Sequence, residues 1–426
     1  MKPKTKIIHM AVIATVLFFA TVTSLSQQLP YERNIKFESE ASATLVGENG
    51  LIMRTDDGGL TWTEQTSGTT NVLNSNDYYT DGINNYMLAV GENGIILKST
   101  DQGTTWEIKT TETTEHLHDV KILNAEVTYA CGNNGTLIIS PDLGETWGIV
   151  PLSTNADLKS LSFFTDASLN QYGFLAGLAV IFKMEVNGTL WQEADVQPIM
   201  NEIFKFNSIY MLDENQIFAA GDNGLLVMSN DGGLSWNRIE TGFGLNVNEI
   251  KFTSPVNGVA SCDDGYILLT QNGGLTWSAN KTPVIDDLYS VNFANENFGI
   301  SVGENGTELY TIDGGQTWTT SLSSGDATYR VTITENSVTQ LTNYPNPFNP
   351  NTKISYNLLN DAQVTAKIFD MLGRTVMDYG TNFQKAGTHT HEFNASGLSS
   401  GIYFYSVKTN AEGSESFKTL RLILTK

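Results

Sequence analysis

Seven tryptophans recur along the chain at a nearly constant spacing. Successive tryptophans stand 44, 41, 44, 45, 41 and 41 residues apart, and none falls outside the series. A period in the low forties with fixed turn glycines is typical of propellers, in which each repeat forms one four-stranded blade of a ring. The spacing therefore predicts an all-β fold with a seven-bladed β-propeller. Its tryptophans are Trp62, Trp106, Trp147, Trp191, Trp236, Trp277 and Trp318.

A fixed turn runs into each tryptophan. In the first unit it reads Thr55-x-Asp57-x-Gly59-x-Thr61-Trp62, which is the Asp-box or BNR repeat. Its carboxylate can accept hydrogen bonds from N–H groups of its own turn, so we interpret the aspartate as structural and not catalytic. The fourth unit keeps only Gly188 and Trp191 of this turn. The corresponding positions elsewhere are Asp57, Asp101, Asp142, Asp231, Asn272 and Asp313.

A second turn, such as Gly47-Glu48-Asn49-Gly50, precedes the third strand of most units. Asn-Gly between apolar stretches is the strongest short hairpin signal. One strand separates this turn from the Asp-box, so we expect the two kinds of turn on opposite faces. The acidic hairpin tips have no evident structural duty, and a cation or a basic partner could bind them, although acids that merely solvate the turns are the simpler interpretation. These acids are Glu48, Glu92, Asp222, Asp263, Asp264 and Glu304.

Residues 1–26 have the composition of a secretory signal peptide. Three lysines are followed by an apolar run over 7–20 and by small residues at a cleavage position. The run is shorter than the ~20 residues of a spanning helix, so cleavage is favoured over anchoring. No later segment is apolar enough to cross a membrane, and we do not expect an integral membrane protein.

The negative charge lies between the two ends of the chain. Residues 27–340 hold 13 basic and 40 acidic residues, a net charge of −27, whereas residues 341–426 carry +2. An acidic surface of this size repels phosphates, so a nucleic-acid partner is excluded.

The cysteines and histidines do not indicate a metal centre or a cofactor. Cys131 and Cys262 fall in the third and sixth units, too far apart around a ring for a disulfide, and we interpret both as buried residues. His116 and His118 beside Asp119 lack a third ligand at a metal-site spacing. Near the degenerate fourth unit, Phe204, Phe206 and Tyr210 either line a ligand site or belong to the core.

The motif "AVGENGxIxxSxDxGxTW" resembles the photosystem II stability and assembly factor-like propellers over residues 35–320. The resemblance implies an assembly role without catalytic residues. A basic patch contributes to partner contacts in that family, whereas the only arginines between Ile35 and Thr320 are Arg54 and Arg238.

Sialidases also carry Asp-boxes, but they grip a carboxylate with three arginines. Arg33, Arg54 and Arg238 are the only arginines before residue 330, and their positions do not predict a central cluster. We therefore expect a non-catalytic binding or scaffold module with a protein or glycan partner. A glycoside hydrolase-like enzyme is the alternative.

The composition changes after the last tryptophan. A Ser- and Thr-rich linker over 321–340 leads to "NYPNPFNP", "KIFDMLGRTV" and "ASGLSSGIYFYSVKT", whose alternating strands predict a small Ig-like sandwich. This segment, residues 341–426, resembles the type A C-terminal sorting domain of the type IX secretion system. The resemblance implies contact with that machinery and export through the periplasm, to the medium or the outer cell surface. The expected domains are a signal peptide (1–26), a propeller (27–320), a linker (321–340) and the sorting domain.

Overall fold

The computed structural model describes residues 31–196, 204–322, 338–358, 361–370, 374–411 and 414–426. The expected signal peptide and most of the expected linker lie outside these residues.

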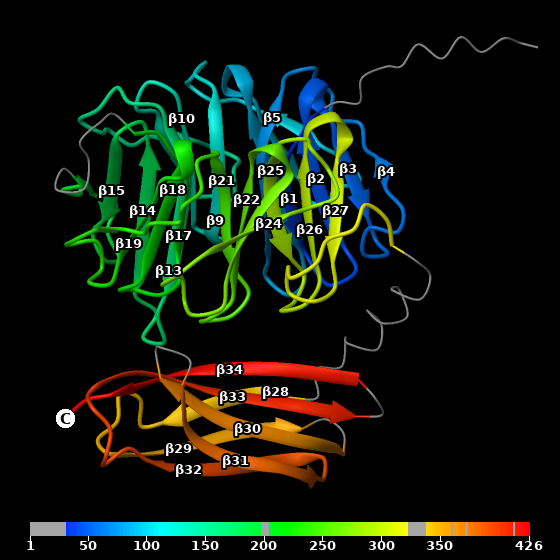
Figure 1. Cartoon of the computed structure of the whole chain (residues 1–426). Coiled ribbons are helices and arrows are strands. Elements are labelled where there is room, and N and C mark those ends of the chain that lie inside the picture. The colour runs from blue at the N-terminus through cyan, green and yellow to red at the C-terminus, as the bar shows by residue number, and fades with distance from the viewer. Residues whose placement is uncertain (1–30, 197–203, 323–337, 359–360, 371–373, 412–413) are drawn as a thin grey trace, which may run out of the picture.

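Seven successive sheets form a ring, and the strands of each sheet pair in chain order (Figure 1). Six sheets have four strands, and the seventh has three, extended by a bridge between Tyr310 and Thr319. The described residues thus show the predicted all-β propeller, and their seven sheets agree with the predicted number of blades. The blades comprise β1 (Glu32–Phe37), β2 (Ala43–Gly47), β3 (Ile52–Thr55) and β4 (Thr63–Glu64); β5 (Leu73–Thr80), β6 (Asn85–Gly91), β7 (Ile96–Ser99) and β8 (Glu107–Lys109); β9 (Leu117–Asn124), β10 (Val127–Gly132), β11 (Leu137–Ser140) and β12 (Gly148–Ile149); β13 (Leu158–Thr165), β14 (Gln171–Gly177), β15 (Val180–Met184) and β16 (Trp191–Glu193); β17 (Phe206–Met211), β18 (Ile217–Gly221), β19 (Leu226–Ser229) and β20 (Asn237–Arg238); β21 (Val247–Phe252), β22 (Gly258–Cys262), β23 (Tyr266–Thr270) and β24 (Ser278–Lys281); β25 (Leu288–Phe293), β26 (Gly299–Gly303) and β27 (Glu308–Thr311).

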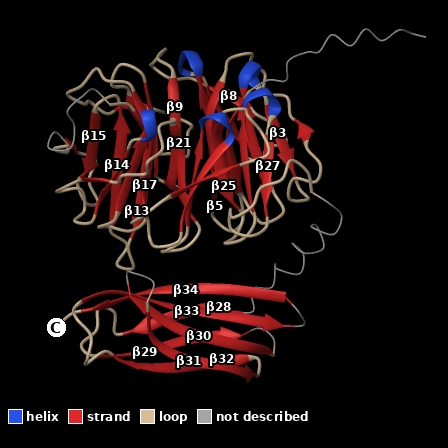
Figure 2. Ribbon diagram, in the orientation of Figure 1, coloured by secondary structure: helices blue, strands red, loops and turns tan. Residues whose placement is uncertain are grey.

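Five of the seven hairpins between second and third strands form short 3-10 turns at one end of the ring (Figure 2). In the first of them Asn49 has φ 56° and Gly50 has φ 70°. A Cβ on Gly50 would lie 2.1 Å from the carbonyl oxygen of Thr69, so only glycine fits there. We call this end, with the loops that join successive blades, the hairpin face. The turns are η1 (Glu48–Gly50), η2 (Glu92–Gly94), η4 (Asp222–Gly224), η5 (Asp263–Gly265) and η6 (Glu304–Gly306).

The opposite end of the ring, which we call the Asp-box face, carries the Asp-box turns and the hairpins between first and second strands. Six of the tryptophans stand directly before the fourth strand of their blade or open that strand, and Trp318 stands directly before the bridge residue Thr319. Its ring packs on the preceding blade, as Trp147 does with Leu88 and Val90. An indole buries a large apolar area, so each repeat stabilises the contact with its neighbour.

Side-chain packing closes the ring. Each blade in the described part of the chain is built from consecutive strands, so the first and last blades share no strand. Phe37 instead packs edge-on against Phe298, with ring centroids 5.7 Å apart, and Ile35 joins the same apolar cluster. The indole of Trp62 donates a hydrogen bond of 3.3 Å to the hydroxyl of Tyr310.

The degenerate fourth blade still has four strands. Ala179 adopts φ 57° in its altered turn. The nearby aromatic residues belong to the core: Phe206 is fully buried, and Tyr210 stacks on Phe252. Phe204 is partly buried and packs against the apolar cluster that contains Phe206. Both cysteines are buried and free, as expected.

The C-terminal residues form a sandwich of two antiparallel sheets. Alternate residues of β30 and β33 point into its core with Tyr356 and Phe393, so the expected alternation is confirmed. One sheet has the order β28-β29-β32 and the other β31-β30-β33-β34. The strands are β28 (Val338–Tyr344), β29 (Asn351–Leu358), β30 (Ala362–Asp370), β31 (Thr375–Gln384), β32 (Gly387–Asn394), β33 (Gly401–Ala411) and β34 (Ser414–Leu424).

The proline-rich motif of this sandwich covers one end of the edge strand β34. The Asn346 side chain accepts from the N–H of Ile423 at 2.8 Å and donates to the carbonyl of Arg421 at 3.1 Å. Phe348 is buried in the core, and its N–H donates to the carbonyl of Ile423 at 2.9 Å. The motif therefore satisfies part of an edge that would otherwise be open to pairing.

Candidate functional site

The first strands of the seven blades line a central channel. A cavity of about 110 Å³ opens among them, and all seven blades contribute to its wall. At the mouth, on the hairpin face, each blade presents the second residue of its first strand. This mouth ring consists of Arg33, Asn74, His118, Lys159, Asn207, Asn248 and Tyr289.

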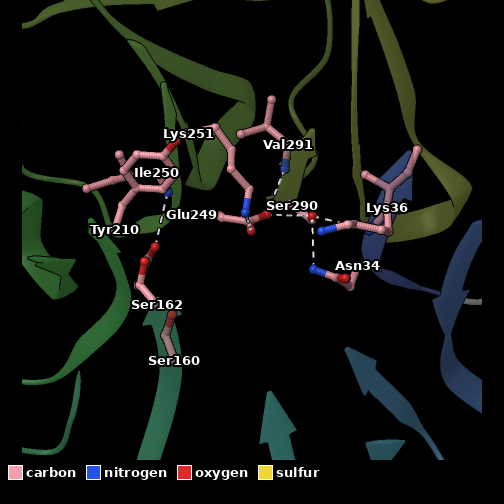
Figure 3. A network of polar contacts seen from close by, with 12 residues as sticks. Asn34, Lys36, Ser160, Ser162, Tyr210, Glu249, Ile250, Lys251, Ser290 and Val291 are labelled. Carbon is pink, nitrogen blue, oxygen red and sulfur yellow. Dashed lines mark hydrogen bonds and ion pairs between the residues drawn. The ribbon is translucent and has the colours of Figure 1, made fainter. Parts of the chain in front are cut away.

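Below the mouth, polar side chains link the blades. An innermost strand has one unpaired edge, and here its N–H groups are satisfied by a side-chain oxygen of the preceding blade. Figure 3 shows one example, in which Glu249 accepts from the N–H of Val291 at 3.0 Å and from the hydroxyl of Ser290 at 2.6 Å. All seven blade junctions have such a bond. In each pair below, the first residue supplies the accepting side-chain oxygen and the second residue the donating N–H: Asn34 and Asn76 (3.3 Å), Asp77 and Ile122 (2.8 Å), Asp119 and Leu161 (2.8 Å), Ser160 and Ile209 (3.1 Å), Ser208 and Ile250 (3.1 Å), Glu249 and Val291 (3.0 Å), and Ser290 and Ile35 (3.3 Å).

The charges inside the channel are paired. Lys251 lies 2.8 Å from Glu249, and Lys36 lies 2.6 Å from Asp77. Burial alone would raise the pKa of Glu249, but Lys251 and the hydrogen bonds from Ser290 and Val291 hold it below its usual value. Within the described residues, the channel interior is therefore a network of paired charges and hydrogen bonds that links the blades.

The mouth ring has a small basic sector. Burial and, to a lesser extent, the nearby charge of Lys159 lower the pKa of His118 to about 4, so this imidazole is neutral at pH 7. Its Nε2 lies 2.8 Å from Nζ of Lys159. Arg33 lies over the ring of Tyr289, 4.8 Å from its centroid, and forms an ion pair of 2.8 Å with Glu48.

The expectation that the hairpin acids have no structural duty is wrong for four of the six. Their carboxylates bond to the mouth ring at a fixed separation of 15 residues, because the register of the first two strands places the tip over the ring. The contacts are Arg33 to Glu48 (2.8 Å), Asn207 to Asp222 (3.0 Å), Asn248 to Asp263 (2.8 Å) and Tyr289 to Glu304 (3.0 Å). Among the described residues, the carboxylates of Glu92 and Asp264 make no such contact with the ring.

A second hydrogen bond also holds the hairpin tips, and it joins residues that are 23 positions apart in the chain. The backbone N–H of the second tip residue donates to a side chain in the following inter-blade loop. For example, Asp264 donates to Asp287 at 2.9 Å, and Asn93 donates to Nδ1 of His116 at 3.1 Å. His116 therefore holds a turn, and no group of three potential metal ligands occurs within the described ranges.

The Asp-box carboxylates bond to their own turns. Asp231 accepts from the N–H of Ser235 at 2.8 Å and from its hydroxyl at 2.5 Å, while the hydroxyl of Ser229 donates to it at 2.8 Å. The Ser235 hydroxyl is the main cause of the lowered pKa of Asp231. The same contacts surround Asp57, Asp101, Asp142 and Asp313, and Asn272 takes the aspartate's place.

The three early arginines each have their own acidic partners. Arg33 is at the mouth, whereas Arg54 is buried and bonds to Glu38 at 2.9 Å and to Asp56 at 2.7 Å. Arg238 lies on the outermost strand β20 of its blade, 3.6 Å from Glu240. This distribution gives no arginine triad around a common point.

Sequence reasoning missed the mouth ring and the links between blades. The first strands nevertheless carry a signal, since each alternates an apolar residue with polar ones, as in "VNEIKF" and "LKSLSFF". The separations of 15 and 23 residues also recur, but they become contacts only in the register of the folded blade.

Two families match parts of the chain. Residues 20–114 match the photosynthesis system II assembly factor YCF48, and residues 342–420 match the secretion system C-terminal sorting domain. The predicted resemblance to both is confirmed. No curated protein matches the chain in sequence.

Solved propellers share the fold. A structure described as YCF48 bound to D1 peptide is 18% identical, with a TM-score of 0.55, and the match covers 67% of this chain and 94% of that one. YCF48 from Cyanidioschyzon merolae is 16% identical, with a TM-score of 0.55, over 67% and 96% of the two chains. The WD40 propeller domain of Doa1 is 12% identical, with a TM-score of 0.54, over 67% and 94%.

The chain thus combines a propeller of the YCF48 type with a type IX sorting domain, which directs export to the medium or the cell surface. Within the described residues, no helix has the length and apolar character needed to cross a membrane.

Proposed function

We propose that the chain is an exported, non-catalytic propeller that binds a basic segment of a protein partner on its hairpin face. The observation that carries the proposal is the construction of that face. Its tips are held by two sets of fixed contacts, so the face is rigid, and Glu92 and Asp264 project from it without a bond to the mouth ring. A preorganised acidic surface attracts a cationic ligand at little ordering cost.

A protein partner is favoured over a glycan. A structurally similar propeller is described as bound to a peptide. The acidic tips surround a mouth with hydrogen-bond donors, which suits a basic segment with exposed backbone carbonyls. The alternative of a glycoside hydrolase-like enzyme has little support, because the channel carboxylates are bonded to lysines and to backbone N–H groups.

Peptide binding to the full chain tests this proposal. A fluorescein-labelled Lys-rich peptide and a Glu-rich peptide of equal length are titrated at low salt, with fluorescence anisotropy as the readout. We expect only the Lys-rich peptide to bind, and its affinity to fall as salt rises, because the attraction is screened. Combining Glu92→Gln with Asp264→Asn should weaken binding severalfold and leave thermal unfolding unchanged.

A variant with the same charge change on the other face is the control. Glu126 and Glu185 are exposed in turns of the Asp-box face, so Glu126→Gln with Glu185→Gln should bind like the unmodified chain. Equal affinities of the two double variants for the peptide would show that the hairpin acids are solvated surface residues that do not contribute to binding. Turnover of a fluorogenic sialoside by the purified chain would contradict the non-catalytic assignment.

A further inference from the structure

The sorting domain lies beside the Asp-box face of the propeller. Figure 1 shows β34 as the strand of the sandwich next to the ring, and Figure 2 shows the 3-10 turns of the hairpin face at the far end. Among the hairpins between first and second strands, that of the fifth blade pairs with β34, and that of the seventh blade carries Glu296, on which the charge of Lys418 of β34 acts.

In the fifth blade, Asp213 pairs with Arg421 of β34. One carboxylate oxygen of Asp213 accepts from the N–H groups of Asn215 and Gln216, at 2.8 and 3.0 Å, and so holds its own turn. The other oxygen faces the guanidinium group. The Asp213 side chain is only 7% exposed and that of Arg421 is 21% exposed. A charge pair shielded to this extent is screened less than a surface pair.

The equivalent turns of the second and fourth blades explain why one carboxylate oxygen of Asp213 has no side-chain donor in its own turn. In the second blade, the second oxygen of Asp81 accepts from the Asn84 side chain at 3.1 Å. In the fourth blade, that of Asp166 accepts from Asn170 at 2.9 Å. In the fifth blade the corresponding side chain is Gln216, whose amide points to the carbonyl of Gly273 at 3.4 Å. The second carboxylate oxygen of Asp213 therefore takes its hydrogen-bond donor from outside the turn, from Arg421 of β34.

Two further observations indicate that this side of the sandwich is an interface. Burial raises the pKa of Glu296, in the seventh-blade hairpin, to about 7, and the charge of Lys418 on β34 acts against that rise. Phe404, the cross-strand partner of Arg421, is buried, although Tyr403 and Tyr405 are the neighbours that enter the sandwich core.

We infer that the Asp-box face is a docking surface for the basic edge strand of the sorting domain. Asp213 and Glu296 receive Arg421 and Lys418, and the charge difference between the acidic propeller and the basic tail favours the same arrangement. Docking holds the tail on the face opposite the proposed partner site, so the hairpin face stays open while the tail is attached. This inference does not depend on the proposed function.

Cross-linking within the full chain tests the docking without altering the charge pair itself. Cysteines are placed beside the contact by Glu214→Cys and Thr425→Cys, and a short bismaleimide is added at low protein concentration. The native cysteines are buried and remain in place. We expect an intramolecular cross-link, detected by mass spectrometry, and much less of it when Glu92→Cys on the hairpin face replaces Glu214→Cys.

Charge reversal then tests whether the ion pair between Asp213 and Arg421 holds the sorting domain on the Asp-box face. Adding Arg421→Glu to the Glu214→Cys and Thr425→Cys chain should lower the cross-link yield severalfold, and adding Asp213→Arg as well should restore it. Unchanged near-ultraviolet circular dichroism shows that each variant is folded. Equal yields from the two cysteine pairs, or a yield that Arg421→Glu does not change, would overturn the inference.

Discussion

Glu32 occupies a position that is apolar in the other six blades. It is 5% exposed, and its Oε2 has no hydrogen-bond partner among the described residues. Burial raises the pKa of Glu32, and Glu308 across the seam between the first and last blades raises it further. The equivalent residues are Leu73, Leu117, Leu158, Phe206, Val247 and Leu288, all fully buried.

We expect Glu32→Leu to raise the free energy of unfolding by about 1–3 kcal/mol, the cost of a buried polar group without a partner. The folded protein holds the Glu32 proton more tightly than the unfolded chain does. The contribution of this group to stability is therefore greatest below its unfolded pKa, near 4.5, and falls as pH rises toward the folded value. Urea unfolding at several pH values measures both effects.

The matched control is Leu73→Glu, which places a second carboxyl group at the same level of the ring. It should destabilise the chain, more strongly at neutral pH than in acid. A Glu32→Leu chain less stable than the unmodified one at pH 7 would show that the carboxyl group has a partner in the fold.

At the scale of the element, the Asp-box is a turn held by one side chain. Asp142 accepts from the N–H and the hydroxyl of Thr146, at 2.8 and 2.6 Å. In the sixth blade Asn272 accepts from the N–H of Thr276 at 3.0 Å and donates to its hydroxyl at 2.8 Å. An amide can therefore replace the carboxylate in this turn.

We expect Asp142→Ala to lower the free energy of unfolding by about 1–2 kcal/mol, because it leaves turn donors without an acceptor. Asp142→Asn should cost clearly less, since it reproduces the contacts of Asn272. Chemical denaturation of the two variants side by side measures the difference. Equal losses would mean that the charge, and not the hydrogen-bond geometry, holds the turn.

At the scale of the whole molecule, the ring depends on bonds between neighbouring first strands. Glu249 and Asp77 both have pKa values below their usual ones, although burial alone would raise them, because lysines and backbone N–H groups surround them. Their contribution to stability is present above the unfolded pKa values of 4.5 and 3.8, and it is lost as pH falls toward the folded values.

We therefore expect the melting temperature to fall in acid, and Glu249→Gln to flatten that fall. Glu249→Gln keeps an acceptor for Val291 and Ser290 but loses the pair with Lys251. Glu249→Ala should cost about 1–3 kcal/mol, because it leaves the buried N–H of Val291 without an acceptor and the half-buried Lys251 without its partner. Melting curves from about pH 3 to pH 7 test both variants. If the melting temperature of Glu249→Gln fell in acid as much as that of the unmodified chain, the Glu249 carboxylate would not contribute to acid unfolding.

The features that could be predicted from the sequence depend mainly on neighbouring residues. The Asp-box turns are local, because each is held by residues within a few positions of itself, and the tryptophan period and the Asn-Gly dipeptides are visible in the sequence. They were sufficient for the blade count and the two faces, and the motifs after the last tryptophan identified the sorting domain.

Contacts between side chains across the ring, in contrast, could not be predicted from the sequence. The carboxylate of Glu249 reaches Val291, 42 residues later, and Arg421 reaches Asp213, 208 residues earlier. Such pairs depend on strand register and on the closure of the ring, which a local pattern does not contain. For the same reason, no partner for the hairpin acids could be predicted from the sequence. The folded register places Glu48, Asp222, Asp263 and Glu304 against the mouth of the channel.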